Sequence, residues 1–194
     1  MKFRSFSALL VVCALSAVCA AQQVSSQSGV FVSQTPFTLS DKDNEQISKL
    51  DAALPAKLQG QSFSDIQYLS DGLRVTGMLA VPRGPGKYPC IILNRGGNLE
   101  FGAWTHASFA GFVGPLVDAG YVVIASQYRG NAGGEGKEEF GGAEVDDVLN
   151  LIPLLGPVPQ ADTSRIGMYG GSRGGLMTYL ALARTDRKIG RAHV

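Results

Sequence analysis

Hydrophobic residues follow two different patterns between residues 65 and 126. In Leu73–Val81 (LRVTGMLAV) large apolar residues mostly alternate with other residues, and this period of two predicts a strand with one face more exposed. Asp71-Gly72 directly before it predicts a tight turn that follows another strand over Asp65–Ser70. Cys90–Leu93 and Tyr121–Ala125 are continuously apolar, which is typical of strands covered on both faces of a parallel sheet.

Helical spacing of apolar residues alternates with these strands. Ala103–Ala119 predicts a crossover helix, and Ala143–Ile152 predicts a second helix that ends at Pro153. A further apolar strand is expected at Ile166–Tyr169, followed by a helix over Arg173–Arg184. This alternation indicates an α/β domain with roughly five or six strands, which is few for a complete doubly wound domain.

The first 64 residues are expected to contain no part of this sheet. Residues 1–20 combine a basic start, the apolar run Ala8–Val18 and small residues at the end, and they predict a secretory signal peptide and therefore export. A membrane anchor is the alternative, although the run is short for a bilayer span. Residues 21–64 predict a polar, loosely ordered segment over Gln22–Ser40. A short helix over Asp41–Leu54 follows, capped by Ser40 or Asp41. The apolar side of this helix would be formed by Ile47, Leu50 and Leu54.

Composition and charge exclude several classes of function. The chain has 194 residues, 45% of them hydrophobic, and a formal net charge of +1, as expected of one globular domain. Lys and Arg are dispersed, so no nucleic-acid partner is indicated. No cofactor-binding loop and no metal-ligand cluster is visible. Cys13 and Cys19 would leave with the signal peptide, so Cys90 is expected to be a buried apolar residue without a disulfide partner.

The segment Gly170-Gly171-Ser172-Arg173-Gly174 carries the main chemical signal. It matches G-x-S-x-G between a predicted strand and a predicted helix, which is the context of a nucleophilic serine on a sharp turn. The positions of Gly170 and Gly174 are expected to require the smallest residue, because strand and helix pass almost in contact there. A phosphate-binding loop would need a lysine, and a dinucleotide fingerprint would need a glycine where Ser172 stands. A purely structural glycine turn is the alternative.

A second glycine-rich segment, Asn94–Asn98 (NRGGN), follows the first continuously apolar strand. In a hydrolase with a serine turn, a loop at this place offers a backbone amide to the oxyanion, beside the amide of the residue after the serine. The predicted donors are therefore the amide of Arg173 and the amide of Arg95 or Gly96. The alternative is a flexible loop without a catalytic role.

Taken together, four segments resemble the prolyl oligopeptidase family of serine hydrolases over about Asp65–Arg184. These segments are SDGLRVTGMLAVP, YPCIILNRGGN, GYVVIASQYRGNAGGEGKEEFGG and DTSRIGMYGGSRGGLMTYLALA. The resemblance implies an α/β-hydrolase fold and hydrolysis of peptides through an acyl-enzyme, while some relatives are esterases. It also implies that Ser172 is the nucleophile and that the Arg173 amide is one oxyanion donor.

The chain departs from the family pattern at several positions. Asn94 stands where relatives often have histidine or tyrosine. Many relatives carry a β-propeller before the hydrolase domain, and residues 22–64 are too short to hold one. Glu138-Glu139 should therefore not be equated with the amine-anchoring glutamates of dipeptidyl-peptidase relatives. Tyr128-Arg129-Gly130 matches a family segment near the site, with a role that the sequence leaves open.

The catalytic acid and histidine are the largest departure. In this fold they follow the serine in chain order, but after Ser172 the chain offers only Asp186 and His193. His106 precedes the serine, in the predicted crossover helix. Residues 189–194 (IGRAHV) can be back-translated into a common sequencing-adapter sequence. We therefore interpret residues 65–188 as a partial α/β-hydrolase domain, truncated before its acid and histidine and inactive as it stands, with 189–194 as an adapter tail.

The expected function is that of an exported serine-type peptidase, with no membrane association after signal cleavage. Its substrate would be a peptide or a small ester, since a carboxylesterase or lipase-like hydrolase on the same machinery is the first alternative. A non-catalytic binding domain that retains the fold is the second. No cofactor or metal is expected, and the sequence does not define the oligomeric state.

Overall fold

The computed structural model describes residues 27–186, 189, 192 and 193. The predicted signal peptide, with Cys13 and Cys19, lies outside these residues, as do Gly190, Arg191 and Val194 of the segment 189–194. In the described part of the chain, no helix is both long and apolar enough to cross a membrane.

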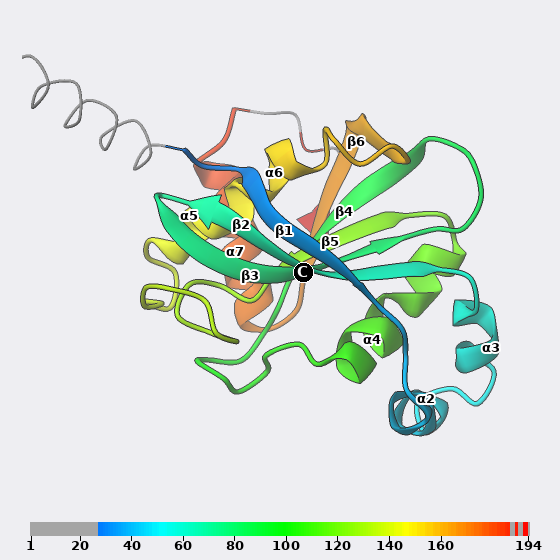
Figure 1. Ribbon diagram of the computed structural model, residues 1–194. Coiled ribbons are helices and arrows are strands. Elements are labelled where there is room, and N and C mark those ends of the chain that lie inside the picture. The colour runs from blue at the N-terminus through cyan, green and yellow to red at the C-terminus, as the bar shows by residue number, and fades with distance from the viewer. Residues whose placement is uncertain (1–26, 187–188, 190–191, 194) are drawn as a thin grey trace, which may run out of the picture.

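A seven-stranded mixed sheet forms the centre of the molecule, with strand order β1-β2-β3-β5-β4-β6-β7 (Figure 1). Its strands are β1 (Val30–Phe37), β2 (Ser62–Ser70), β3 (Leu73–Val81), β4 (Tyr88–Asn94), β5 (Val122–Ser126), β6 (Ala161–Gly170) and the two-residue β7 (Ala192–His193). β1, β2 and β3 are antiparallel, and β3 runs antiparallel to β5. β5, β4, β6 and β7 are parallel, as the continuously apolar runs predict for β4 and β5.

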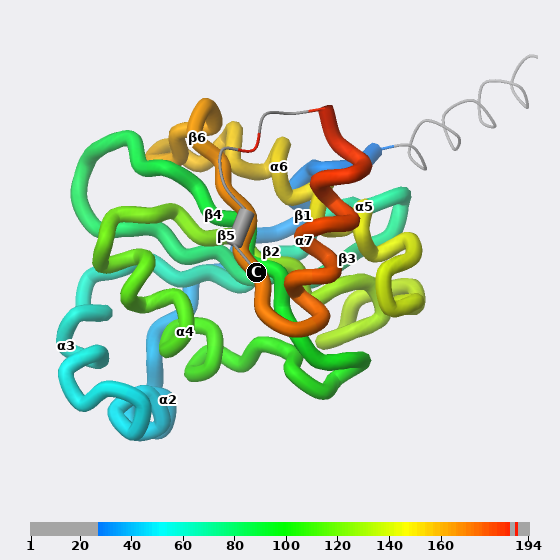
Figure 2. The backbone as a smooth tube through the Cα atoms, turned by 180° about the vertical axis from the view of Figure 1, so that it is seen from behind, coloured from blue at the N-terminus to red at the C-terminus, as the bar shows by residue number. Residues whose placement is uncertain are grey.

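The helices cover both faces of this sheet (Figures 1 and 2). The helices on one face share a core with Met78, Ala80 and Val123; they are α2 (Asp41–Ser48), α3 (Leu54–Leu58) and α4 (His106–Asp118). Those on the other face share a core with Val75, Leu79 and Ile92; they are α5 (Glu144–Leu149), α6 (Leu151–Leu154) and α7 (Arg173–Ala183). The domain is therefore a three-layer α/β structure.

The hairpin prediction is confirmed, but the predicted exposure of β3 is wrong. Asp71 and Gly72 both have positive φ, 51° and 78°, as a tight two-residue hairpin turn requires. Of the nine residues of β3 only Arg74 is exposed. Leu73 and Thr76 are half-buried, and the other six residues are buried because helices pack on both sides of the strand. The alternating residues of β3 face two packed layers of helices, one on each side of the sheet, rather than a core on one side and solvent on the other.

The prediction of a loosely ordered lead-in over 22–40 is also wrong for its described part. Val30–Phe37 forms β1, which pairs antiparallel with β2 at the edge of the sheet. Most of its side chains are exposed, and Val30 and Val32 are each 47% exposed. An edge strand that buries so little needs no strong apolar pattern, so its sequence resembles that of a polar linker.

Two predicted helices are shorter than expected. Ser40 caps α2, and its hydroxyl accepts a hydrogen bond from the Asp43 amide, but the helix ends at Ser48. Leu50 is 73% exposed and so does not share the buried side of the predicted helix. The helix expected over 143–152 breaks at Asn150 into α5 and α6. Pro153 lies within α6 rather than after it, at a first-turn position where no backbone donor is needed.

Candidate active site

Ser172 occupies the sharp junction between β6 and α7. Its backbone angles are φ 56° and ψ −128°, a conformation that costs a non-glycine residue about 1–3 kcal/mol. The residue is exposed. Because Arg173 is the first residue of α7, the turn places the serine at the start of a helix, where backbone amides and the helix dipole favour negative charge.

The two flanking glycines leave no room for side chains. A Cβ atom at Gly170 would lie 2.3 Å from the carbonyl oxygen of Gly174. A Cβ atom at Gly174 would lie 2.1 Å from the carbonyl oxygen of Asn94. Both contacts are far inside van der Waals distance and involve backbone. A Cβ atom at Gly171 would meet nothing within 4 Å. Close packing of β6, α7 and the end of β4 therefore depends on Gly170 and Gly174.

The loop Asn94–Asn98 lies directly against the serine turn. A Cβ atom at Gly96 would be 3.7 Å from the Cβ of Ser172 and 3.3 Å from the carbonyl oxygen of Gly171. Within the described residues, neither the Gly96 amide nor the Arg173 amide donates a hydrogen bond. The structure thus brings the serine, the Gly96 segment and the start of α7 together.

Asn94 does not contribute a side-chain donor at this point. Its side chain is buried, and its Nδ2 donates to Thr178 Oγ1 of α7 at 2.9 Å. The Asn94 side chain therefore links β4 to α7 beneath the turn.

A buried cluster of charges lies behind the two loops. The side chains of Arg95 and Arg173 are 0% and 2% exposed, and those of Glu138 and Glu144 are 1% and 0% exposed. Glu138 pairs with Arg173 at 3.0 Å and with Arg95 at 3.5 Å, while Glu144 pairs with Arg173 at 2.8 Å. Both guanidiniums lie over the Tyr128 ring, 5.0 and 5.2 Å from its centroid. We call these five residues the buried charge cluster.

Burial and pairing shift the ionisation of this cluster. Burial lowers the pKa of Arg95 and raises the pKa of Tyr128 far above its ordinary value. Burial also tends to raise the pKa of Glu144, but the amides of Gly141 and Glu139 and the Arg173 guanidinium outweigh it and hold that pKa below its ordinary value. Glu144 is therefore a carboxylate that pairs with a cation.

Sequence reasoning missed this cluster. It considered Glu138 only as a glutamate to be distinguished from amine-anchoring ones, and it considered Arg95 and Arg173 only for their backbone amides. The sequence places both arginines inside the two glycine-rich segments, and a buried arginine requires carboxylate partners. Neither their burial nor the carboxylates that they meet follows from the sequence, so this signal does not identify the cluster.

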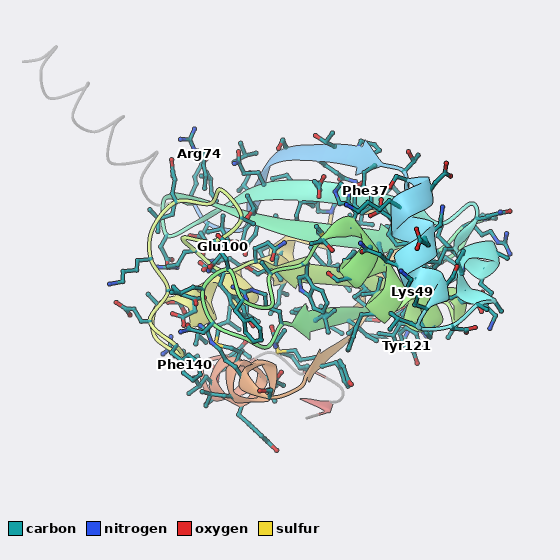
Figure 3. All side chains as sticks on the ribbon, turned by 90° about the horizontal axis from the view of Figure 1, so that it is seen from below. Phe37, Lys49, Arg74, Glu100, Tyr121 and Phe140 are labelled. Carbon is teal, nitrogen blue, oxygen red and sulfur yellow. The ribbon has the colours of Figure 1, made fainter. Side chains whose placement is uncertain are left out.

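His106, the histidine whose side chain the structure describes, pairs with Asp65 rather than with Ser172. His106 begins α4, where its Nε2 lies 2.9 Å from Asp65 and its ring stacks on Phe37 at 3.7 Å. Figure 3 shows Phe37 well apart from Phe140, whose ring contacts the Arg173 guanidinium at 4.6 Å. The backbone of His193 pairs with Tyr169 of β6.

The remaining residues singled out by sequence have structural surroundings. Asp186 is exposed just beyond α7. Arg129 forms ion pairs at 2.7 Å with both Asp71 and Asp147, so it ties the β2–β3 hairpin to α5. Cys90 is buried in β4, and burial raises its pKa to about 11, as expected of a packed rather than a reactive thiol. No metal-binding group of three or more His, Cys, Asp or Glu occurs in the residues that the structure describes.

Comparison with known proteins supports this reading of the fold. The sequence matches the prolyl oligopeptidase family over residues 107–190. It is 40% identical over 126 residues to the uncharacterized peptidase YtmA of Bacillus subtilis, covering 65% of this chain and 48% of YtmA. It is 30% identical over 111 residues to dipeptidyl-peptidase 5 of Porphyromonas gingivalis, covering 53% of this chain and 16% of that protein. The chain thus spans about half the length of YtmA and a smaller part of dipeptidyl-peptidase 5.

Solved structures agree with the sequence relatives. The acylaminoacyl peptidase of Pyrococcus horikoshii matches with a TM-score of 0.54 and 26% identity, over 70% of this chain and 23% of that one. The rice cell wall degrading esterase LipA of Xanthomonas oryzae matches with a TM-score of 0.63 and 18% identity, over 85% of this chain and 49% of that one. The described structure covers part of the α/β-hydrolase fold, and the sequence is similar, over residues 107–190, to the prolyl oligopeptidase family.

Proposed function

We propose that this protein is a serine-type peptidase in which Ser172 is the nucleophile. The observation that carries the proposal is the strained, exposed conformation of Ser172 between β6 and α7, with the Gly96 segment packed against it. Strain of this kind persists only where the surrounding structure maintains it. The family match and the YtmA relative favour peptides as substrates.

In the proposed mechanism, the Ser172 Oγ attacks the substrate carbonyl carbon while its proton passes to a histidine base. The carbonyl oxygen becomes an oxyanion, which the amide of Arg173 and the amide of Gly96 or Arg95 would bind. Collapse of this intermediate transfers the proton to the leaving amine and forms an acyl-enzyme. Water then attacks the acyl-enzyme, and Ser172 is regenerated.

The base and its acidic partner are a separate part of the proposal. In this fold both follow the nucleophile in chain order, and the described residues after Ser172 place neither beside it. Because the chain spans 48% of YtmA, we propose that the complete gene product supplies the histidine and the acid from later segments. Residues 27–186 would then be inactive alone, since a serine without its base loses several orders of magnitude in rate.

Hydrolysis by the complete gene product tests the proposal. Peptide p-nitroanilides and short-chain p-nitrophenyl esters should be compared, because the esterase alternative uses the same machinery. Ser172→Ala should lower kcat/KM on the preferred class by about 1,000-fold or more. Ser33→Ala is the matched control, because Ser33 is an exposed serine on the edge strand β1. Preference for esters would replace the peptidase assignment, and equal activity of Ser172→Ala and wild type would refute the nucleophile.

We also propose that the protein is exported, on the basis of the signal-peptide pattern in residues 1–20. N-terminal sequencing of the mature protein from the periplasm or the medium tests this. Cleavage near Ala20 is expected. Recovery of the uncleaved chain from the membrane fraction would favour the anchor instead.

A further inference from the structure

We propose that Glu138 is a positioning residue that holds the serine turn and the Asn94–Asn98 loop in register with each other. The inference rests on the proposed function, because these two segments supply the amides that would bind the oxyanion. Glu138 lies in the glycine-rich loop of residues 130–142, and it acts through its neighbours rather than on the substrate.

The carboxylate of Glu138 is buried, and both of its oxygens have polar partners. Its Oε1 pairs with Arg173 Nη1 at 3.0 Å and accepts a hydrogen bond from the Leu99 amide. Its Oε2 accepts from Asn131 Nδ2 at 3.0 Å and lies 3.5 Å from Arg95 Nη2. Each carboxylate oxygen therefore accepts one hydrogen bond and forms one ion pair. Among the described residues, removing the charge would leave the buried Arg95 without a carboxylate partner and Arg173 with Glu144 alone.

Both arginines also bind backbone carbonyls of the Asn94–Asn98 loop or of the residues directly after it. Arg173 Nη1 donates to the Gly97 carbonyl at 3.1 Å. Arg95 Nη2 donates to the Leu99 carbonyl at 2.9 Å, and its Nη1 donates to the Phe101 carbonyl at 3.3 Å. The Arg173 guanidinium therefore spans from the serine turn to the loop, while the Arg95 guanidinium fixes the curve of the loop. Glu138 joins the two.

Glu144 does not have this bridging position. It pairs with Arg173 at 2.8 Å, and its carboxylate also accepts hydrogen bonds from two amides of its own loop, those of Gly141 and Glu139. Within the described residues only Glu138 pairs with both arginines. A change at Glu138 should therefore alter the spacing between the two segments, whereas Glu144 anchors the serine turn alone.

Backbone strain gathers around this cluster. Six described non-glycine residues have positive φ, and four of them belong to this cluster or to the segments around it: Leu99, Tyr128, Phe140 and Ser172, with φ between 51° and 64°; the other two are Asp71 and Ala132. The Leu99 amide binds Glu138, the Tyr128 ring contacts both guanidiniums, and the Phe140 ring contacts Arg173. Figure 3 shows Phe140 beside α7. Strained residues need surrounding contacts that fix them, and the pairs of Glu138 are contacts of this kind.

The test compares Glu138→Gln and Glu138→Asp with the matched control Glu139→Gln in the complete gene product. Glu139 is the exposed neighbour in the same loop, and its carboxylate accepts only the Ala143 amide among the described residues. Active sites are counted by titration with a fluorophosphonate, and kcat and KM are then expressed per active site. The affinity for a trifluoromethyl ketone, whose adduct carries an oxyanion, is measured in parallel.

Glu138→Gln should lower kcat per active site by about 10- to 100-fold, because a small displacement of oxyanion donors costs this much. KM should change little, and the affinity for the trifluoromethyl ketone should fall by the same factor as kcat/KM. Glu138→Asp keeps the charge and should lie between wild type and Gln; it carries the same test if the Gln variant does not fold. Glu139→Gln should match wild type.

A purely structural role would give a different result. It would lower the melting temperature and the number of titrated sites but leave kcat per site and ketone affinity unchanged, and this outcome would overturn the inference while leaving the proposed function intact. Failure of the fluorophosphonate to label Ser172 in wild type would instead overturn the proposed function, and the inference with it.

Discussion

Two arginine–carboxylate groups lie on neighbouring parts of this fold and differ in what they connect. Arg129 pairs with Asp147 and Asp71 at 2.7 Å and so joins α5 to the β2–β3 hairpin. The pairs of Arg173 with Glu138 and Glu144 join two loops at the proposed oxyanion site. Both groups use the same chemistry in buried surroundings. The difference shows that a buried ion pair has to be judged by the backbone segments that it holds, because its geometry alone does not distinguish support of the fold from support of a site.

The largest effect in this comparison is expected at the glycines of the serine turn. Gly174→Ala would place a Cβ atom 2.1 Å from the Asn94 carbonyl oxygen, and backbone on both sides cannot move apart without opening the junction. The variant should be destabilised by more than about 3 kcal/mol, beyond the usual cost of overpacking because the contact is with backbone, measured by urea unfolding. Gly171→Ala is the matched control, since nothing lies within 4 Å of its Cβ position, and it should unfold at the urea concentration of wild type. Equal stability of the two variants would contradict the packing argument.

A smaller effect of a different kind is expected for the Arg129 pair. Arg129→Met should lower the free energy of unfolding by about 3 kcal/mol, because it leaves the fully buried Asp147 without its cation. Turnover per active site should stay close to wild type, in contrast to Glu138→Gln. Chemical denaturation and active-site titration of the same preparations measure the two quantities. A fall in turnover per site for Arg129→Met would erase the distinction between the two groups.

The smallest effect is expected at an ion pair far from both groups. Ser164 and Arg165 bind the Asp162 carboxylate and lower its pKa from 3.8 to about 2. The folded state therefore favours the ionised form, so this stabilisation is present above pH 4 and is lost as the pH falls towards 2. In Asp162→Asn, the melting temperature should fall slightly less steeply than in wild type as the pH is lowered from 5 to 2. An unchanged acid branch would show that the pair adds nothing.

Sequence patterns predicted the sheet well where strands are buried and poorly at its edge. The continuously apolar runs of β4 and β5 indicate strands that are buried on both faces. Asp71-Gly72 indicates a tight turn because these two residue types readily adopt positive φ. Val30–Phe37 gives no comparable signal because it buries little surface. The serine turn was predictable since its glycines, nucleophile and helix start are adjacent in the chain.

The buried charge cluster was not predictable in the same way. Arg95, Glu138 and Arg173 lie far apart in the sequence and meet only because β4, β6 and the loop of residues 130–142 end at the same edge of the sheet. No spacing rule links them. Their contact is a product of the fold, and the fold has to be known before the pairing can be inferred.

The most direct measurement of the central claim is the site of covalent modification by a fluorophosphonate, located by peptide mass spectrometry of the complete gene product. The account predicts one adduct, on the peptide that contains Ser172, and its loss in Ser172→Ala but not in Ser33→Ala. Modification of another residue, or an unmodified Ser172 in folded wild-type protein, would contradict the assignment of this strained turn as the site of a nucleophile.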